Sequence, residues 1–115
     1  MSSVDVALES IVNKIHSKDR FLSLEINPSL SAKIEENTIN ELRELYNIDA
    51  FVVTDSPIAR FKPSSIFSSL KFQNALQKPV ICTLSMRDRN SLVLCGDILG
   101  VNELGLRAFL ILTGD

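Results

Sequence analysis

The sequence predicts an α/β fold in which four parallel strands alternate with helices. Apolar runs of strand length begin at Phe21, Ala50, Pro79 and Arg107, so successive runs start 29, 29 and 28 residues apart. The stretches between these runs carry apolar residues at helical spacing. Such regular spacing is typical of βα units, in which right-handed helical crossovers keep the strands parallel.

A helix is expected before the first strand, within residues 1–20. Ser2, with Asp5 three positions later, resembles a capping pair at its start. The first strand covers residues 21–26, and Asn27-Pro28-Ser29 ends it because proline has no backbone N–H to donate to a neighbouring strand. The apolar face of the helix consists of Val4, Leu8, Ile11, Val12 and Ile15.

The second unit combines a helix over residues 31–46 with a short strand. The helix is predicted from apolar residues near one face, with glutamates and an arginine mostly on the other. Residues 50–54 form an almost wholly apolar run, which is how a parallel strand covered on both faces reads. The apolar positions of the helix are Ile34, Ile39, Leu42, Leu45 and Tyr46.

The third and fourth units repeat this order. A helix capped by Ser64 or Ser65 leads to a strand over residues 79–84. Asn90 or Ser91 then opens a helix that ends at Gly105, since glycine accepts the left-handed conformation that follows a helix. The fourth strand covers residues 107–112. The apolar residues of the last helix are Leu92, Leu94, Ile98, Leu99 and Leu104.

We expect one domain over residues 1–115. Two architectures are consistent with its pattern of strands and helices. One is an open flavodoxin-like sheet, and the other is the first half, about four strands, of a (β/α)8 TIM barrel. The sequence stops after strand four, where an open sheet would normally gain another helix. We therefore expect a fragment that folds poorly without the remaining half or a second chain.

Composition argues against several classes of protein. Apolar residues make up 45% and charged residues 23%, and 12 basic against 14 acidic residues leave a net charge of −2 without a basic run, so no nucleic-acid role is expected. Neither a membrane-length apolar stretch nor a signal peptide is present, which predicts a cytoplasmic protein with no membrane role. Cys82 and Cys95 lack metal-ligand spacing, so we expect reduced core cysteines and no metal site.

Ligand sites in parallel α/β folds lie at the carboxyl ends of the strands, and these positions are polar here. Glu25 stands out, because it lies within an apolar strand where burial would favour its protonated form. A protonatable glutamate at a strand end suits a general acid. The other strand-end residues are Thr54, Asp55, Thr83, Ser85, Thr113, Gly114 and Asp115.

Basic residues near two strand ends have two interpretations. Arg87 and Arg89 lie in a solvated loop that caps a helix, or they meet phosphate groups. Arg60 and Lys62 carry the same two interpretations. His16, the single histidine, lies late in the first helix and is a weak catalytic candidate.

At these strand ends the chain resembles the methylenetetrahydrofolate reductases, especially the short bacterial and archaeal forms. The resemblance runs from Phe21 onward, and the order and spacing of its motifs carry it. The motifs are Ser23-Leu24-Glu25-Ile26-Asn27-Pro28, Val53-Thr54-Asp55-Ser56-Pro57, Arg87-Asp88-Arg89-Asn90 and Leu112-Thr113-Gly114-Asp115.

The resemblance implies a (β/α)8 barrel that holds FAD at its mouth. Such an enzyme of one-carbon metabolism and methionine biosynthesis passes a hydride from NAD(P)H to the flavin and then to 5,10-methylenetetrahydrofolate, which gives 5-methyltetrahydrofolate. Glu25 matches the family's proton donor to the folate, and Asp115 matches a catalytic aspartate beside the flavin. The implied flavin contacts are Thr54, Asp55, Cys82 or Thr83, Thr113, Gly114 and Asp115.

The chain departs from the family at two points. Many members place a histidine against the flavin where this chain has Cys82 or Thr83, and the second half of the barrel has no counterpart here. The resemblance also implies a homo-oligomer. The alternative function is a half-barrel subunit or interaction module without activity of its own.

Overall fold

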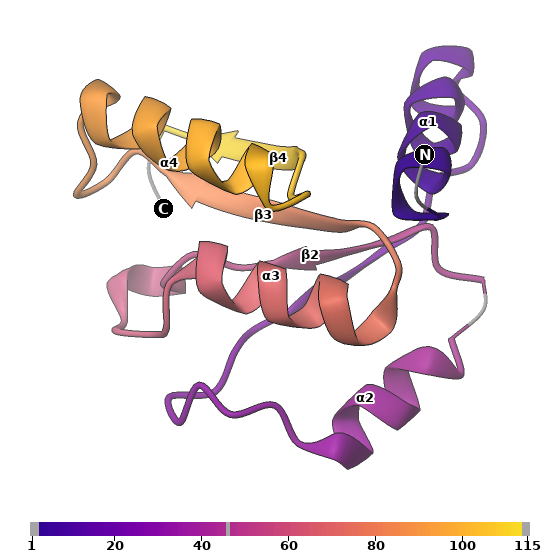
Figure 1. The fold of residues 1–115 in the computed structure, drawn as a ribbon, viewed down its shortest axis with the longest axis horizontal. Helices are drawn as coiled ribbons and strands as arrows, with labels where there is room; N and C mark the ends of the chain where they lie inside the picture. The colour runs from indigo at the N-terminus through magenta and orange to yellow at the C-terminus, as the bar shows by residue number, and fades with distance from the viewer. Residues whose placement is uncertain (1–2, 46, 114–115) are drawn as a thin grey trace.

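The computed structural model describes residues 3–45 and 47–113, and it confirms an α/β fold. Within these ranges four strands form one parallel sheet and alternate with helices (Figure 1). The elements in chain order are α1 (Ser3–Ser17), β1 (Ser23–Ile26), α2 (Glu36–Arg43), β2 (Ala50–Val53), the short 3-10 helix η1 (Pro57–Ala59), α3 (Ser65–Leu76), β3 (Val80–Ser85), α4 (Ser91–Glu103) and β4 (Ala108–Leu112).

The strands lie in the order β1-β2-β3-β4, and each neighbouring pair is parallel. Glu25 is opposite Val52, Val52 is opposite Ile81, and Ile81 is opposite Ala108. A flavodoxin-like sheet has a switch point where the strand order reverses, and this sheet has none. The flavodoxin-like alternative is therefore wrong, and the arrangement is consistent with half of a barrel.

Two apolar clusters join the helices to one face of the sheet, which we call the covered face. In the first cluster Ile39 of α2 and Phe72 of α3 pack with Phe51 of β2. In the second, Val101 of α4 packs with Leu84 of β3. Because successive crossovers have the same hand and run in the same direction, they place α2, α3 and α4 on the same side. Figure 1 shows α3 and α4 lying across the front of the sheet.

The opposite face, which we call the open face, carries the alternate residues of each strand. Helices α2, α3 and α4 pack on the covered face, and at the carboxyl half of the open face Pro57 and Ile58 of η1 border the sheet. As a result Val52 is only half-buried, whereas Phe51 and Val53 on the covered face are fully buried. The expectation that strand two is covered on both faces is confirmed except at Val52, because Ala50 and Thr54 on the same side are 0% and 8% exposed. The open-face residues are Ser23, Glu25, Ala50, Val52, Thr54, Ile81, Thr83, Ser85, Ala108, Leu110 and Leu112.

Helix α1 lies beside the amino ends of the strands, where two ion pairs hold it (Figure 1). Asp5 accepts from Arg107 at 2.8 Å, just before β4, and Lys14 Nζ is 2.6 Å from Asp49 Oδ1, just before β2. Asp49 also accepts from the backbone N–H of Leu22 at 2.8 Å. The bond from Lys14, and then that from Leu22, hold the pKa of Asp49 below its usual value.

The helix expected over residues 31–46 is shorter than predicted. It spans Glu36–Arg43, because the chain after β1 first forms an irregular segment in which Ala32 has a φ of 61°. The hydroxyls of Ser29 and Ser31 are 2.9 Å apart in this segment and favour a turn over a helix. Tyr46, like Ser2 of the expected capping pair, lies outside the described residues.

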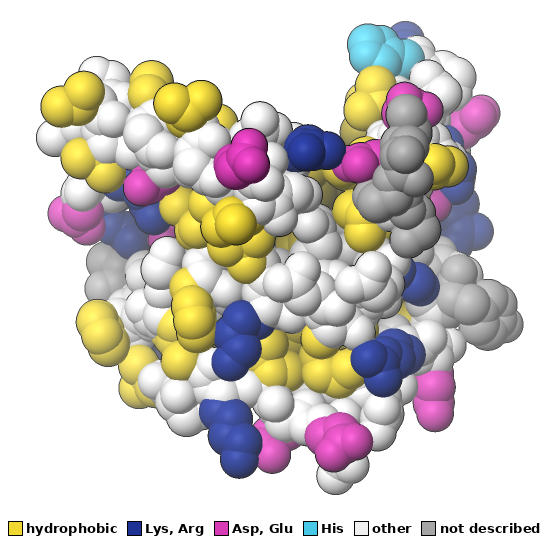
Figure 2. Space-filling view, viewed as in Figure 1, with side chains coloured by type: hydrophobic (Ala, Val, Ile, Leu, Met, Phe, Trp, Pro, Cys, Tyr) yellow, Lys and Arg dark blue, Asp and Glu magenta, His cyan; other side chains and the backbone are white. Residues whose placement is uncertain are grey.

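The expected caps of helix α4 are confirmed, but the apolar residues that it buries differ from those expected. Asn90 accepts from the N–H of Val93 at 2.8 Å, and Gly105 has a φ of 93° just beyond the helix. Leu94, Ile98 and Val101 pack inward at helical spacing. The other apolar residues point to solvent, and Figure 2 shows apolar side chains on the surface over α4. Exposed fractions are 83% for Leu92, 75% for Leu99 and 65% for Leu104.

The remaining differences concern single residues. Cys95 is exposed on α4, so the expectation that it belongs to the core is wrong. Ser64 occupies the N-cap position of α3, but its side chain makes no capping hydrogen bond. Among the described residues, no helix has the length and apolar character needed to cross a membrane.

Candidate functional site

A pocket of about 510 Å³ lies on the open face at the carboxyl ends of the strands, and we call it the rim pocket. Glu25, Thr54 and Thr83, named from the sequence as strand-end residues, come together in its wall. Glu25 is registered with Val52 and Ile81, and Thr54 and Thr83 lie two positions further along those strands, so all three point to the same side. The full lining is Glu25, Val52, Thr54, Asp55, Pro57, Ile58, Thr83, Ser85, Leu110 and Leu112.

Glu25 is exposed on β1, so its expected burial is wrong. The expectation assumed that Leu24 and Ile26 mark a strand enclosed on all sides. Instead Leu24 and Ile26 pack against the core of the covered face, while Glu25 points to the open face. Its carboxylate therefore lies in the rim pocket and in contact with solvent.

Thr54 and Thr83 present buried hydroxyl-bearing side chains beside that carboxylate. Thr54 is 8% exposed and Thr83 is 5% exposed. Thr54 Oγ1 donates to Asn27 Oδ1 at 3.2 Å, which ties the end of β2 to the end of β1. A ligand in the pocket would meet these side chains from the open face.

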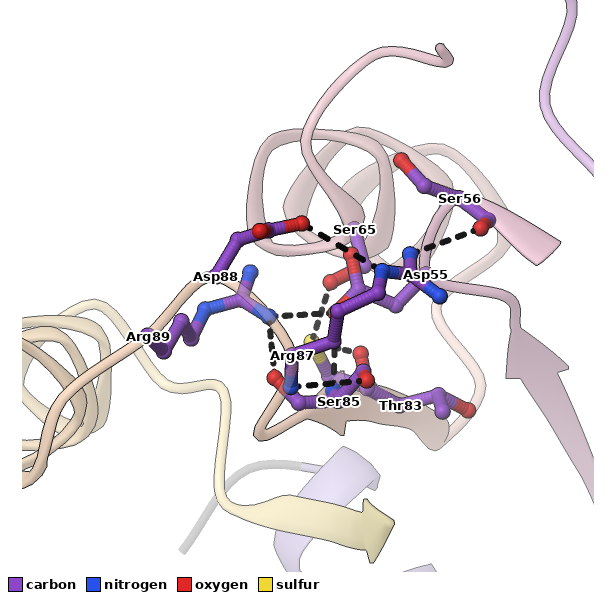
Figure 3. A network of polar contacts seen from close by, with 9 residues as sticks. Asp55, Ser56, Ser65, Thr83, Ser85, Arg87, Asp88 and Arg89 are labelled. Carbon is purple, nitrogen blue, oxygen red and sulfur yellow. Dashed lines mark hydrogen bonds and ion pairs between the residues drawn. The ribbon is translucent and has the colours of Figure 1, made fainter. Parts of the chain in front are cut away.

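Asp55 performs a structural task at the rim that the sequence did not predict. Its Oδ2 atom accepts from the N–H of Ser85 at 2.8 Å and from Arg89 Nη1 (Figure 3). Arg89 Nη1 also donates to the carbonyl of Ser85 at 2.9 Å. The side chains of Asp55 and Arg89 are only 9% and 16% exposed, so this ion pair is largely removed from water. The pair fixes the loop after β2 against the loop after β3.

Arg87 extends this network toward the η1 loop. Its Nη2 donates to the carbonyl of Ser56 at 2.9 Å, its Nε contacts Asp88 Oδ2 at 3.3 Å, and its backbone N–H donates to Ser85 Oγ at 3.1 Å (Figure 3). The two loops that border the rim pocket are thus cross-linked by guanidinium groups. Arginine suits this role because its planar group donates several hydrogen bonds at once.

Both loops also contain residues in the left-handed backbone region. Ser56, Ile58 and Asp88 have φ values of 41°, 59° and 64°. For a β-branched residue such as Ile58 this conformation is unfavourable by about 1–3 kcal/mol. Ile58 is nevertheless 79% exposed and lines the rim pocket. The cross-linked loops hold it there, and no sequence pattern indicated this position.

The choice between Cys82 and Thr83 is decided by their faces. Cys82 is fully buried on the covered face, where its Sγ lies 3.7 Å from Ser65 Oγ. It belongs to the second apolar cluster and does not line the rim pocket, so the structure does not place it with the other expected cofactor contacts. Burial raises the pKa of the Cys82 thiol and keeps it protonated at neutral pH. Thr83 is the residue that lines the pocket.

The last strand end is described only in part. Thr113 is exposed and follows β4 directly. Gly114 and the expected catalytic Asp115 lie outside the described residues. Within the described ranges, no group of three or more histidine, cysteine, aspartate or glutamate side chains is arranged to hold a metal ion.

Comparison with known proteins does not identify a relative. No protein-family model, no curated protein and no solved structure matches the chain.

Proposed function

We propose that the chain forms the first half of a (β/α)8 barrel that reduces 5,10-methylenetetrahydrofolate with a bound flavin and NAD(P)H. The observation that carries the proposal is the meeting of Glu25, Thr54 and Thr83 around one pocket at the carboxyl ends of the strands. The unreversed strand order, with all crossover helices on the covered face, agrees with a barrel. The motif resemblance supplies the chemistry.

The rim pocket has the character that a flavin ring requires. Val52, Leu110 and Leu112 give it apolar surface, while Thr54 and Thr83 supply hydroxyl groups beside that surface. This combination suits a flat, largely apolar ring with polar edges. When bound, FAD would accept a hydride from the nicotinamide and deliver it to the folate.

The residues of this chain divide into two roles around that ring. Glu25, exposed to the pocket, is the proton donor to the folate. Thr54 and Thr83 would hold the polar edge of a bound flavin. Asp55 is a positioning residue, because its Oδ2 is already bonded to Ser85 and Arg89 and fixes the loops that shape the pocket.

The test uses the complete reading frame that encodes this chain. The purified protein should absorb visible light as a flavoprotein and should form 5-methyltetrahydrofolate in the presence of NAD(P)H. Residues 1–115 alone should bind FAD weakly or not at all, because the proposed second half of the pocket is missing. A complete protein without flavin and without folate reduction would refute the proposal.

A second candidate is a half-barrel subunit without activity of its own. The observation in its favour is the exposed apolar surface of the edge strand β4, where Leu110, Ile111 and Leu112 are 46%, 47% and 37% exposed. Such a subunit would complete its barrel with a second chain. A stable, flavin-free species larger than the 12.8 kDa of one chain, found by sedimentation, would favour it.

A further inference from the structure

A second pocket, which we call the outer pocket, lies between the loop after β2 and the loop after β3. Its volume is about 810 Å³, and its wall includes Ser64 and Val93 near the amino ends of α3 and α4. The lining shares only Asp55 with the rim pocket. The outer pocket is therefore a separate place on the molecule.

The wall of the outer pocket is positively charged. It contains four cations, Arg60, Lys62, Arg87 and Arg89, against two carboxylates, Asp55 and Asp88, which leaves 4 − 2 = +2. The whole chain carries −2. The excess of positive charge at this pocket is therefore opposite in sign to the molecule as a whole, and it attracts anions.

Two of these cations are not used by the network that holds the loops together. Arg89 is paired with Asp55, and Arg87 contacts Asp88 and the Ser56 carbonyl. Arg60 and Lys62 make no ion pair with any residue in 3–45 or 47–113. The fixed pairs hold the wall in place, and Arg60 and Lys62 supply charge that a ligand can neutralise.

An aromatic ring accompanies this charge. Phe61 stands between Arg60 and Lys62 in sequence, lines the outer pocket and is 83% exposed. A large apolar side chain exposed to this degree beside cations suits a ligand that combines a flat ring with an anionic group. Arginine and lysine side chains bind phosphate oxygens through charge-assisted hydrogen bonds.

We propose that the outer pocket binds the phosphate groups of a small ligand through Arg60 and Lys62, with a nucleotide whose base stacks on Phe61 as the preferred form. This site is independent of the proposed flavin site. Inorganic pyrophosphate and ADP separate the two parts of the proposal, because they share the phosphate chemistry and only ADP carries a ring.

Isothermal titration calorimetry of the complete protein that contains this chain, with pyrophosphate and with ADP, tests it. The double variant Arg60→Gln/Lys62→Gln should bind both ligands at least about tenfold more weakly. Phe61→Ala should weaken the binding of ADP and leave the binding of pyrophosphate unchanged. Raising the salt concentration from about 50 to about 200 mM should weaken the binding of both ligands.

A matched control is Lys18→Gln/Arg20→Gln. It also removes one lysine and one arginine charge, but from the segment before β1, near the amino ends of the strands. It should bind like the unmodified chain, and circular dichroism should show the same fold for all variants. Equal loss in both double variants would mean that only net charge matters and would overturn the proposal. So would undiminished binding by Arg60→Gln/Lys62→Gln, or no heat from either ligand with the unmodified chain.

Discussion

Replacing Asp55 by asparagine should destabilise the fold by about 2–3 kcal/mol. Removing one partner of a buried ion pair typically costs about 3–5 kcal/mol. The expected loss lies at or below the low end of this range because Arg89 is 16% exposed and keeps its bond to the Ser85 carbonyl, while the asparagine oxygen can still accept from the Ser85 N–H. The expected loss lowers the folding equilibrium constant about 30- to 150-fold.

Urea unfolding followed by far-ultraviolet circular dichroism measures this loss, since the chain has no tryptophan to report by fluorescence. Asp88→Asn is the matched control. Asp88 lies in the same network, but its side chain is 86% exposed, and asparagine tolerates its left-handed backbone well. The control should stay within about 0.5 kcal/mol of the unmodified chain.

A double-mutant cycle with Arg89→Gln then isolates the interaction between the two charged side chains. The double variant should be destabilised by less than the sum of the single variants, because neither charge is then left unpaired. If Asp55→Asn unfolds at the same urea concentration as Asp88→Asn, the ion pair contributes nothing and the reasoning is refuted.

Three further predictions concern other parts of the chain. The bond from Lys14 lowers the pKa of Asp49, so its stabilisation is present above pH about 4 and lost as pH falls through the folded-state pKa; Asp49→Asn should therefore lower the melting temperature at pH 7, with a difference that shrinks below pH 4. A thiol reagent such as DTNB should modify exposed Cys95 quickly and Cys82 only upon unfolding; rapid reaction of both would contradict the burial of Cys82. Under the proposed reductase function, Glu25→Gln in the complete protein should slow folate reduction about 10²- to 10⁴-fold and leave flavin reduction by the nicotinamide largely intact; stopped-flow traces with equal losses in both steps would assign Glu25 to flavin binding or to the fold.

The alternation of side chains along strands is what made much of the rim pocket predictable. Glu25, Thr54 and Thr83 could be named as strand-end residues because each follows or interrupts an apolar run. Their common face follows from the period of two in a strand once the register is known. The same period places Cys82 on the opposite face from Thr83, away from the rim pocket.

Contacts between distant loops could not be predicted in this way. Asp55 and Arg89 are 34 positions apart, and their pairing depends on two loops that converge only in the folded chain. The left-handed conformation of Ile58 is equally hidden, since isoleucine disfavours it and the surrounding contacts impose it. The exposure of Glu25 depends on what covers the open face, and strand composition alone does not reveal that.

The bond from the Ser85 N–H to Asp55 has a consequence for how this fold tolerates change. The last registered pair between β2 and β3 joins Val53 to Cys82, so beyond it a side-chain carboxylate takes the place of a strand carbonyl. The chain between Asp55 and the fully buried Ser65 is thus fastened at both ends. Insertions between Pro57 and Ser64 should therefore change the lining of the two pockets with little loss of folding stability. This makes the loop a suitable place for library design.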